Sequence, residues 1–125
     1  ETLLLVEDEE PVRRTLKRIL VRAGYEVLEA ADAESAMALF AEASARIDAA
    51  ILDAVLPDRS GLEVGAAIRE ARPDAPLILS TGYVDALDPK GHRGRLFDRV
   101  LAKPYPADEL LGTLRELLDA AKASR

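Results

Sequence analysis

The stretch LLLVEDEEP, residues 3–11, runs from four apolar residues directly into four acidic ones and ends at a proline. The apolar run is typical of a buried strand, which we place at residues 2–6. Pro11 suits the first turn of a helix, because the N–H that proline lacks would have no intrahelical partner there. Carboxylates repel one another at short range, so their grouping after a buried strand calls for a cation or a phosphate nearby.

Composition limits the classes of protein to consider. A length of 125 residues predicts one domain, covering residues 1–125. The chain has no cysteine, which excludes disulfides and thiolate metal sites and fits the reducing cytoplasm, so we expect a cytoplasmic protein. No apolar run has the length of a membrane span, so we expect no membrane association. The net charge of −6 argues against direct nucleic-acid binding.

Strand-like and helix-like segments alternate along the chain. We expect strands at residues 2–6, 25–30, 49–52, 76–80 and 100–102, with helices starting near residues 11, 33, 60 and 106. Strict alternation predicts an α/β fold: a doubly wound five-stranded parallel sheet with helices on both faces. A fourth helix, between residues 83 and 99, should be short or irregular, because glycine and proline interrupt it. Short turns at 84–87 and 94–97 are the most we expect there.

Single residues mark several helix ends. Gly24 is a C-terminal signal for the first helix, and Asp32 can cap a helix over residues 33–43. Residues 60–63, SGLE, form a capping box that opens a third helix. That helix must end before Pro73.

Polar residues follow four of the five expected strands. They are Glu7 and Asp8 after the first, Asp53 after the third, Thr81 and Gly82 after the fourth, and Lys103 and Pro104 after the fifth. Ligands of open parallel sheets bind beyond the carboxyl ends of the strands, so these residues should share one edge.

The charges at this edge do not balance. Three carboxylates and one lysine leave a formal charge of −2, so either a carboxylate takes up a proton or a cation binds. A hard divalent ion that prefers oxygen ligands, Mg²⁺ or Mn²⁺, meets the need and keeps coordination positions open. The acidic stretch is therefore predicted to be a magnesium site, where a phosphoryl group would complete the coordination of the ion.

Four motifs at these strand ends resemble a known family. They are VEDE (6–9), LDAVLPDRSG (52–61), STG (80–82) and AKP (102–104). Together and in this order they resemble the receiver domain of bacterial two-component response regulators, and the resemblance covers essentially the whole chain. It implies the flavodoxin-like strand order 2-1-3-4-5.

The resemblance also implies the metal ligands and the phosphoacceptor. Asp53 would accept the phosphoryl group as a carboxylate nucleophile. Asp8 would bind Mg²⁺ directly and Glu7 mostly through water. Asp53 and the main-chain carbonyl of Val55 would be further ligands.

The phosphoryl group would have its own contacts. By resemblance, Lys103 would pair with its oxygens and the Thr81 hydroxyl would donate to one of them. Backbone N–H groups near Ala54 and Gly82 would complete the cradle. The bond between Lys103 and Pro104 is usually cis in this family.

The implied function is that of a phosphoacceptor signalling domain. The phosphate would come from a phosphohistidine on a sensor histidine kinase or a histidine-phosphotransfer domain, or from a small acyl phosphate. The chain would catalyse only its own phosphorylation and dephosphorylation, and it would not be an enzyme in the usual sense. Its local style resembles the C-terminal receivers of hybrid sensor histidine kinases, with a stand-alone receiver as the competing interpretation. Self-association is a further expectation.

Five basic residues crowd the first helix: Arg13, Arg14, Lys17, Arg18 and Arg22. They fit either a solvated helix face or a docking surface for an acidic partner.

Some positions depart from the family pattern. Val100 stands where members often carry an aromatic residue, so the usual coupling of a threonine shift to an aromatic rotamer cannot operate as such. We hypothesise instead that phosphorylation orders or shifts the loop of residues 83–97. Val55 and Tyr83 occupy positions that tune dephosphorylation in the family. Neither orients water well, which predicts a long-lived phosphoryl group.

Two other functions compete with this interpretation. A metal-dependent phosphohydrolase with an aspartyl-phosphate intermediate would carry its nucleophile and a second Asp after the first strand, whereas that segment here is Glu7-Asp8-Glu9. A degenerate receiver would serve only as an interaction module, which the intact set of acidic residues, Thr81 and Lys103 argues against. The lone histidine, His92, is expected to be a solvated loop residue.

Overall fold

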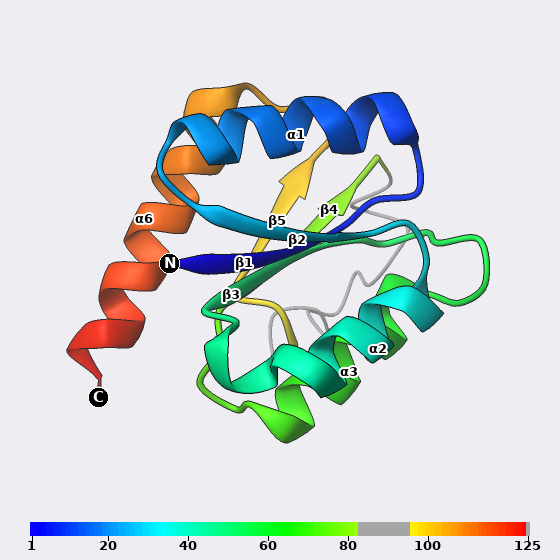
Figure 1. The fold of residues 1–125 in the computed structure, drawn as a ribbon. Coiled ribbons are helices and arrows are strands. Elements are labelled where there is room, and N and C mark those ends of the chain that lie inside the picture. The colour runs from blue at the N-terminus through cyan, green and yellow to red at the C-terminus, as the bar shows by residue number, and fades with distance from the viewer. Residues whose placement is uncertain (83–95, 125) are drawn as a thin grey trace.

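The computed structural model describes residues 1–82 and 96–124 and contains one five-stranded parallel sheet in the order β2-β1-β3-β4-β5 (Figure 1). The doubly wound fold and the strand order are thereby confirmed. The strands are β1 Thr2–Val6, β2 Glu26–Ala30, β3 Ala49–Asp53, β4 Leu77–Thr81 and β5 Arg99–Ala102. The helices are α1 Glu10–Arg22, α2 Ala33–Ala43, α3 Gly61–Ala71 and α6 Ala107–Ala123, with a 3-10 turn at Ser44–Arg46.

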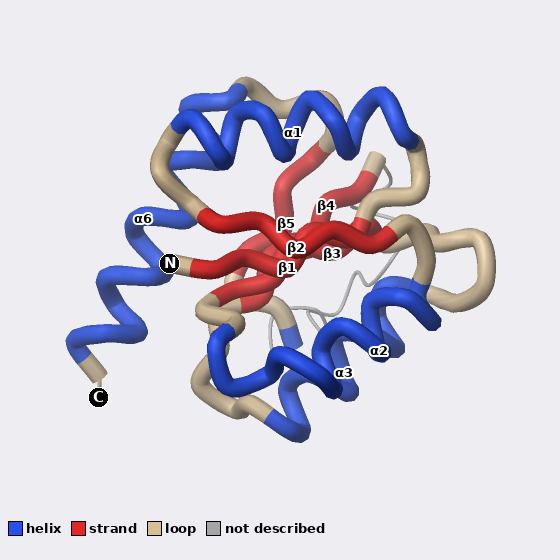
Figure 2. The backbone as a smooth tube through the Cα atoms, viewed as in Figure 1, coloured by secondary structure: helices blue, strands red, loops and turns tan. Residues whose placement is uncertain are grey.

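Helices cover both faces of the sheet, α1 and α6 on one side and α2 and α3 on the other (Figure 2). Side chains alternate between the faces, so neighbours along β1 belong to different cores. Leu5 packs with Leu20 and Leu114 under α1 and α6, whereas Leu4 packs with Phe40 and Ile68 over α2 and α3. Strands β1, β3 and β4 are buried along their whole length, as a doubly covered sheet requires.

The first helix ends as predicted, and its end explains why β2 starts one residue later than expected. Gly24 has a φ of +101°, which glycine adopts without strain. Its N–H donates to the carbonyl of Val21 (3.0 Å), and the N–H of Tyr25 donates to that of Leu20 (3.1 Å). This pair of bonds is a Schellman motif, and it uses Tyr25 to cap α1. Strand pairing therefore begins at Glu26.

Asp32 and Ser60 cap α2 and α3 as predicted, but the bond of Ser60 is not that of the expected capping box. The Asp32 side chain accepts a hydrogen bond from the N–H of Ser35 (2.7 Å). The Ser60 hydroxyl accepts from the N–H of Leu62 (3.1 Å), one position earlier than a capping box requires. Helix α3 ends at Ala71, two residues before Pro73, as expected.

Contacts with α3 hold the residues that lead into β5. The Arg69 guanidinium donates to the carbonyl of Leu96 (2.8 Å) and to the carboxylate of Asp98 (2.9 Å). The ring of Phe97 lies against Gly65, where a Cβ atom would approach it to 2.5 Å. These contacts hold the start of β5, the strand that Lys103 directly follows. Most of the expected fourth helix, including the turn at 84–87, lies outside the described residues.

Among residues 1–82 and 96–124, no helix combines the length and the apolar character needed to cross a membrane.

Candidate functional site

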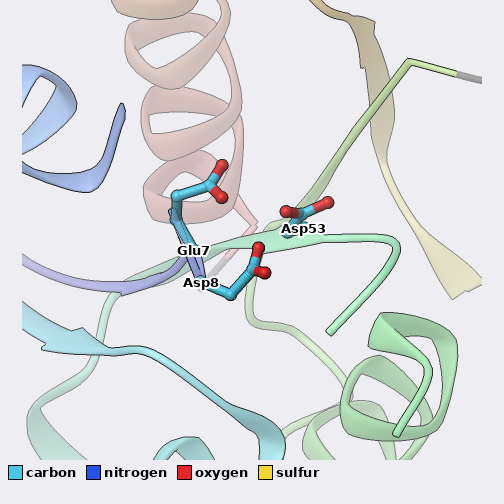
Figure 3. Close-up of side chains that lie close together, drawn as sticks. All are labelled: Glu7, Asp8 and Asp53. Carbon is cyan, nitrogen blue, oxygen red and sulfur yellow. The ribbon is translucent and has the colours of Figure 1, made fainter. Parts of the chain in front are cut away.

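Three carboxylates meet at the carboxyl edge of the sheet. Glu7 and Asp8 follow β1, and Asp53 is the last residue of β3. Carboxylate oxygens of all three lie within 4.8 Å of one another, and Figure 3 shows the side chains extending into a shared space. The sequence-based expectation that these residues share one edge is confirmed.

Lys103, the residue directly after β5, joins this cluster. Its Nζ donates to Oε1 of Glu7 (2.8 Å) and to Oδ2 of Asp53 (3.1 Å). Glu7 and Asp53 are only 2% and 7% exposed, so one ammonium serves two carboxylates that water barely reaches. Asp8, by contrast, is exposed at the rim.

The pKa values of Glu7 and Lys103 reflect the excess of carboxylates over the single lysine. Burial raises the pKa of Glu7, and the neighbouring Asp53 charge adds to the effect, against the hydrogen bonds from Lys103 and from the Glu9 N–H. Burial also disfavours the Lys103 ammonium, but its contacts with Glu7 and Asp53 outweigh this and raise the pKa of Lys103. The site therefore holds a charged lysine beside more negative charge than it can offset.

The cluster opens into a hollow of about 360 Å³ lined by Asp8, Glu9, Asp53, Val55, Thr81, Gly82 and Lys103. Val55 stands at its rim with 60% of its surface exposed, and Thr81 is buried. The N–H of Lys103 donates to the carbonyl of Thr81 (2.8 Å), which fixes the ends of β4 and β5 side by side. The bond between Lys103 and Pro104 is cis, as the resemblance implied.

The two N–H groups after Asp53 have different partners. The N–H of Ala54 donates to the carbonyl of Ser80 (3.0 Å), so strand pairing already uses it. The N–H that faces the site belongs to Val55 and donates to Oδ1 of Asp53 (3.2 Å). Of these two N–H groups, that of Val55 is the one bonded to the Asp53 carboxylate.

Two positions expected to tune the conformational response or dephosphorylation are Val100 and Tyr83, and the structure describes only Val100. Val100 pairs with Leu79 in the sheet and packs, half-buried, against the core on the α2 and α3 side. Tyr83 lies outside the described residues.

Three residues near the site were not singled out for it by the sequence. A Cβ atom on Gly61 would lie 1.9 Å from the main-chain oxygen of Asp53, so only glycine fits beside the strand end. The Asp58 carboxylate accepts from the N–H groups of Ala33 (2.8 Å) and Glu34 (2.9 Å), and these bonds lower the pKa of Asp58. The loop after Asp53 is thereby tied to the start of α2.

The third such residue is Tyr105. Its hydroxyl lies 3.3 Å from the Ser80 hydroxyl, on the face of β4 that also carries Ile78. Asp58 and Gly61 lie within the motif of residues 52–61, and Gly61 also follows a helix cap, whereas nothing in the sequence pointed to Tyr105.

The donor set suits a hard divalent cation. All the donors are oxygens, two of the three carboxylates are buried, and the third is accessible from solvent. A cation here would relieve the repulsion that the single lysine leaves.

The family model described as the response regulator receiver domain matches residues 3–115. The chain belongs to this family. It is a phosphoacceptor signalling domain of a two-component system, as the sequence predicted.

Individual relatives agree with the assignment. The response regulator MprA of Mycolicibacterium vanbaalenii is 35% identical over 93% of this chain and 49% of its own length. The sensor kinase CckA of Brucella abortus is 31% identical over 94% of this chain and 12% of its own length. The chain thus spans about half, or much less, of these two curated relatives.

Solved structures show the same fold. A CheY-like receiver domain from Methanospirillum hungatei superposes with a TM-score of 0.91 at 28% identity, covering 100% of this chain and 98% of its own. The response regulator TrrA of Thermotoga maritima, solved in complex with Mg²⁺ and BeF, has a TM-score of 0.80 at 34% identity and covers 94% of this chain and 98% of its own. Receiver domains interact with histidine kinases or phosphotransfer proteins.

Proposed function

We propose that Asp53 is the phosphoacceptor and that Mg²⁺ or Mn²⁺ is bound by Glu7, Asp8 and Asp53, with the carbonyl of Val55 as a further ligand. The observation that carries this proposal is the convergence of three carboxylates within 4.8 Å beside Lys103. The TrrA structure, whose description names Mg²⁺ and BeF, supports it by analogy.

The proposed chemistry is transfer of a phosphoryl group from a phosphohistidine. A carboxylate oxygen of Asp53 forms a bond to phosphorus while the phosphorus–nitrogen bond breaks, and the electron pair leaves with the imidazole nitrogen. Bound Mg²⁺ would offset the negative charge of the phosphoryl oxygens and of the carboxylate. Lys103 already touches Asp53 and needs only a small shift to donate to a phosphoryl oxygen. The Thr81 hydroxyl and the N–H groups of Val55 and Gly82 would complete the cradle.

Intact mass after treatment with Mg²⁺ and a small acyl phosphate tests the proposal. The wild type should gain the mass of one phosphoryl group, and Asp53→Asn or added chelator should abolish the gain. Steady turnover of a small phosphoester would instead favour a phosphohydrolase. Failure to incorporate phosphate would favour a degenerate receiver that acts only as an interaction module.

A second observation bears on the partner. An apolar groove of about 560 Å³ opens beside Lys103, and it is lined by Pro11, Val12, Thr15, Leu16, Ile19, Lys103, Pro104 and Tyr105. The basic residues of α1 lie on the same helix as most of this lining. We propose that a histidine kinase or histidine-phosphotransfer domain docks here, with apolar side chains in the groove and acidic ones against α1.

Arg18, which is exposed, gives a direct test of this docking surface. Arg18→Glu should slow phosphotransfer from a phosphorylated histidine-phosphotransfer domain and leave the reaction with a small acyl phosphate unchanged. An equal effect on both donors, or on neither, would contradict the docking proposal.

The biological context is part of the same proposal. Relatives include both response regulators and a sensor kinase, which supports either a stand-alone receiver or the receiver of a hybrid kinase. A cytoplasmic location and self-association stay predictions, which fractionation and sedimentation velocity would check.

A further inference from the structure

Arg13 connects the acidic loop to the rest of the fold. Its Nη1 donates to the main-chain carbonyl of Glu7 (2.8 Å), and its Nε donates to Oε1 of Glu29 (3.3 Å). The side chain is only 16% exposed, although α1 is the most basic helix of the described chain. One guanidinium thus joins α1, β2 and the end of β1.

The contact with Glu7 matters because the carbonyl that Arg13 holds is part of the peptide group between Glu7 and Asp8. The peptide group is planar, so holding the C=O of Glu7 also fixes the direction of the Asp8 N–H and Cα. Figure 3 shows Glu7 and Asp8 leaving the chain in different directions toward Asp53. The orientation of this single peptide therefore determines whether the two carboxylates can reach the same ion.

Glu29, the other partner of Arg13, is itself held by a second basic residue. Glu29 also accepts from Nζ of Lys17 (2.5 Å), and the hydrogen bond from Lys17, together with Arg13, lowers the pKa of Glu29. Glu29 consequently stays charged and holds the guanidinium in place. Contacting a carbonyl and a carboxylate at once uses the fork of donors that arginine has and lysine lacks.

We infer that Arg13 is a positioning residue, which holds the Glu7–Asp8 peptide and thereby sets the affinity of the site for a divalent cation. The inference rests on the proposed function, because it takes the carboxylate cluster to be the ion site. It assigns Arg13 a role that differs from the docking role of the other basic residues on α1.

The inference is testable because the charge of Arg13 and its positioning role predict opposite effects of its removal on cation affinity. Removing a positive charge near a cation site should strengthen cation binding if only the charge matters. Removing the group that holds the ligand loop should weaken binding, by about tenfold where such supporting contacts have been altered in metal sites. Arg14 is the matched control: it is the next residue, it is exposed, and it pairs with Glu10 instead of the loop.

The experiment compares Mg²⁺ dissociation constants of the wild type, Arg13→Gln, Arg14→Gln and Arg13→Lys by calorimetry. We expect Arg14→Gln to bind Mg²⁺ as tightly as the wild type or more tightly, and Arg13→Gln to bind it about tenfold more weakly. Arg13→Lys keeps the charge and should also bind more weakly. Equal or tighter binding by both Arg13 variants would overturn the inference.

A metal-free measurement separates this inference from the proposed function. The Glu9 N–H donates to Oε2 of Glu7 (3.1 Å), so its hydrogen exchange reports on the loop without any ion. In the presence of chelator, exchange at Glu9 should be faster in Arg13→Gln than in Arg14→Gln, and equal rates would overturn the inference. A wild type that binds no Mg²⁺ would defeat the proposed function and the link to affinity, whereas the exchange rates would still show whether Arg13 holds the peptide.

Discussion

Glu7 is the most buried of the three carboxylates, and its position is a compromise between stability and binding. It is enclosed by protein, shares Lys103 with Asp53 and lies next to a second negative charge. An isolated protein gains nothing from such an arrangement, because desolvated like charges oppose folding. The arrangement fits the proposed site, in which a cation would offset the excess negative charge.

Glu7→Gln should therefore stabilise the metal-free protein at neutral pH, by about 0.5–2 kcal/mol, the usual range for relieving one unfavourable site. The raised pKa means that the folded protein binds this proton more tightly than the unfolded chain does. Protonation thus favours the fold, and that contribution is lost as the pH rises from the ordinary value of 4.5 through the folded pKa. Urea unfolding in chelator at pH 7 and pH 4 would measure the gain, which should shrink at pH 4. A variant that is less stable than the wild type at pH 7 would contradict this account.

Val55 is the described residue at which we expect a substitution to change the lifetime of the proposed phosphoryl group. It stands 60% exposed at the rim of the hollow, where a bulky apolar side chain cannot orient an attacking water. Val55→Asn should shorten the lifetime several-fold, as measured by loss of the added mass over time. Val21→Asn on α1 is the control, because Val21 is similarly exposed, at 50%, and does not line the site. A wild-type lifetime of seconds, unchanged in Val55→Asn, would count against the prediction.

At the scale of elements, the sequence was informative where a residue acts on its own neighbours. Apolar runs located all five strands within one residue at either end, and Asp32 capped its own helix as predicted. The contacts that the sequence did not reveal join segments that are far apart along the chain. Asp58 caps the start of α2 from another loop, and Arg69 holds Leu96, so neither partner could be known before the fold was known.

Gly61 belongs to the same class of long-range requirement. Its sequence context showed only a helix start, whereas its lack of a side chain leaves room for the main chain of Asp53. Backbone atoms cannot move aside as a flexible side chain can, so the loop or the strand end would have to shift.

Gly61→Ala should consequently destabilise the protein by about 1–3 kcal/mol and misplace Asp53. Gly112→Ala is the matched control, because Gly112 lies within α6 and a Cβ atom added there would meet nothing within 4 Å. That change should stabilise the protein by about 0.5–1 kcal/mol through helix propensity. Urea unfolding of both variants would show the opposite signs, and equal effects would refute the steric argument.

At the scale of the whole molecule, four strand ends build the site and the opposite edge of the sheet ties the chain's first residue to its last helix. The site could be predicted because parallel strands bring their carboxyl ends together whatever lies between them. The contacts at the opposite edge could not be predicted, because no general rule pairs a terminal residue with a helix. Glu1 accepts from both Nη atoms of Arg115 (2.8 Å each) and forms an ion pair with Nζ of Lys122 (3.3 Å).

This terminal network predicts how stability depends on acid. The hydrogen bond from Arg115 is the main cause that lowers the pKa of Glu1 from 4.5 to about 2. A lowered carboxyl pKa gives stability that is fully present above the unfolded value and is lost as the pH falls from about 5 to about 2. Because Arg115 is 45% exposed, solvent screens the pair, and we expect Glu1→Gln to cost only about 1 kcal/mol at pH 7.

The gap in unfolding free energy between the wild type and Glu1→Gln should close as the pH falls to about 2, where Glu1 is half protonated, and below it. Glu10→Gln is the control, because Glu10 and its partner Arg14 are both largely exposed and their pair should contribute little at any pH. Chemical unfolding of the three proteins across this pH range measures the gap directly. A gap that stays constant from pH 7 to pH 2 would mean that packing of the terminal residue, and not its charge, holds α6 against the sheet.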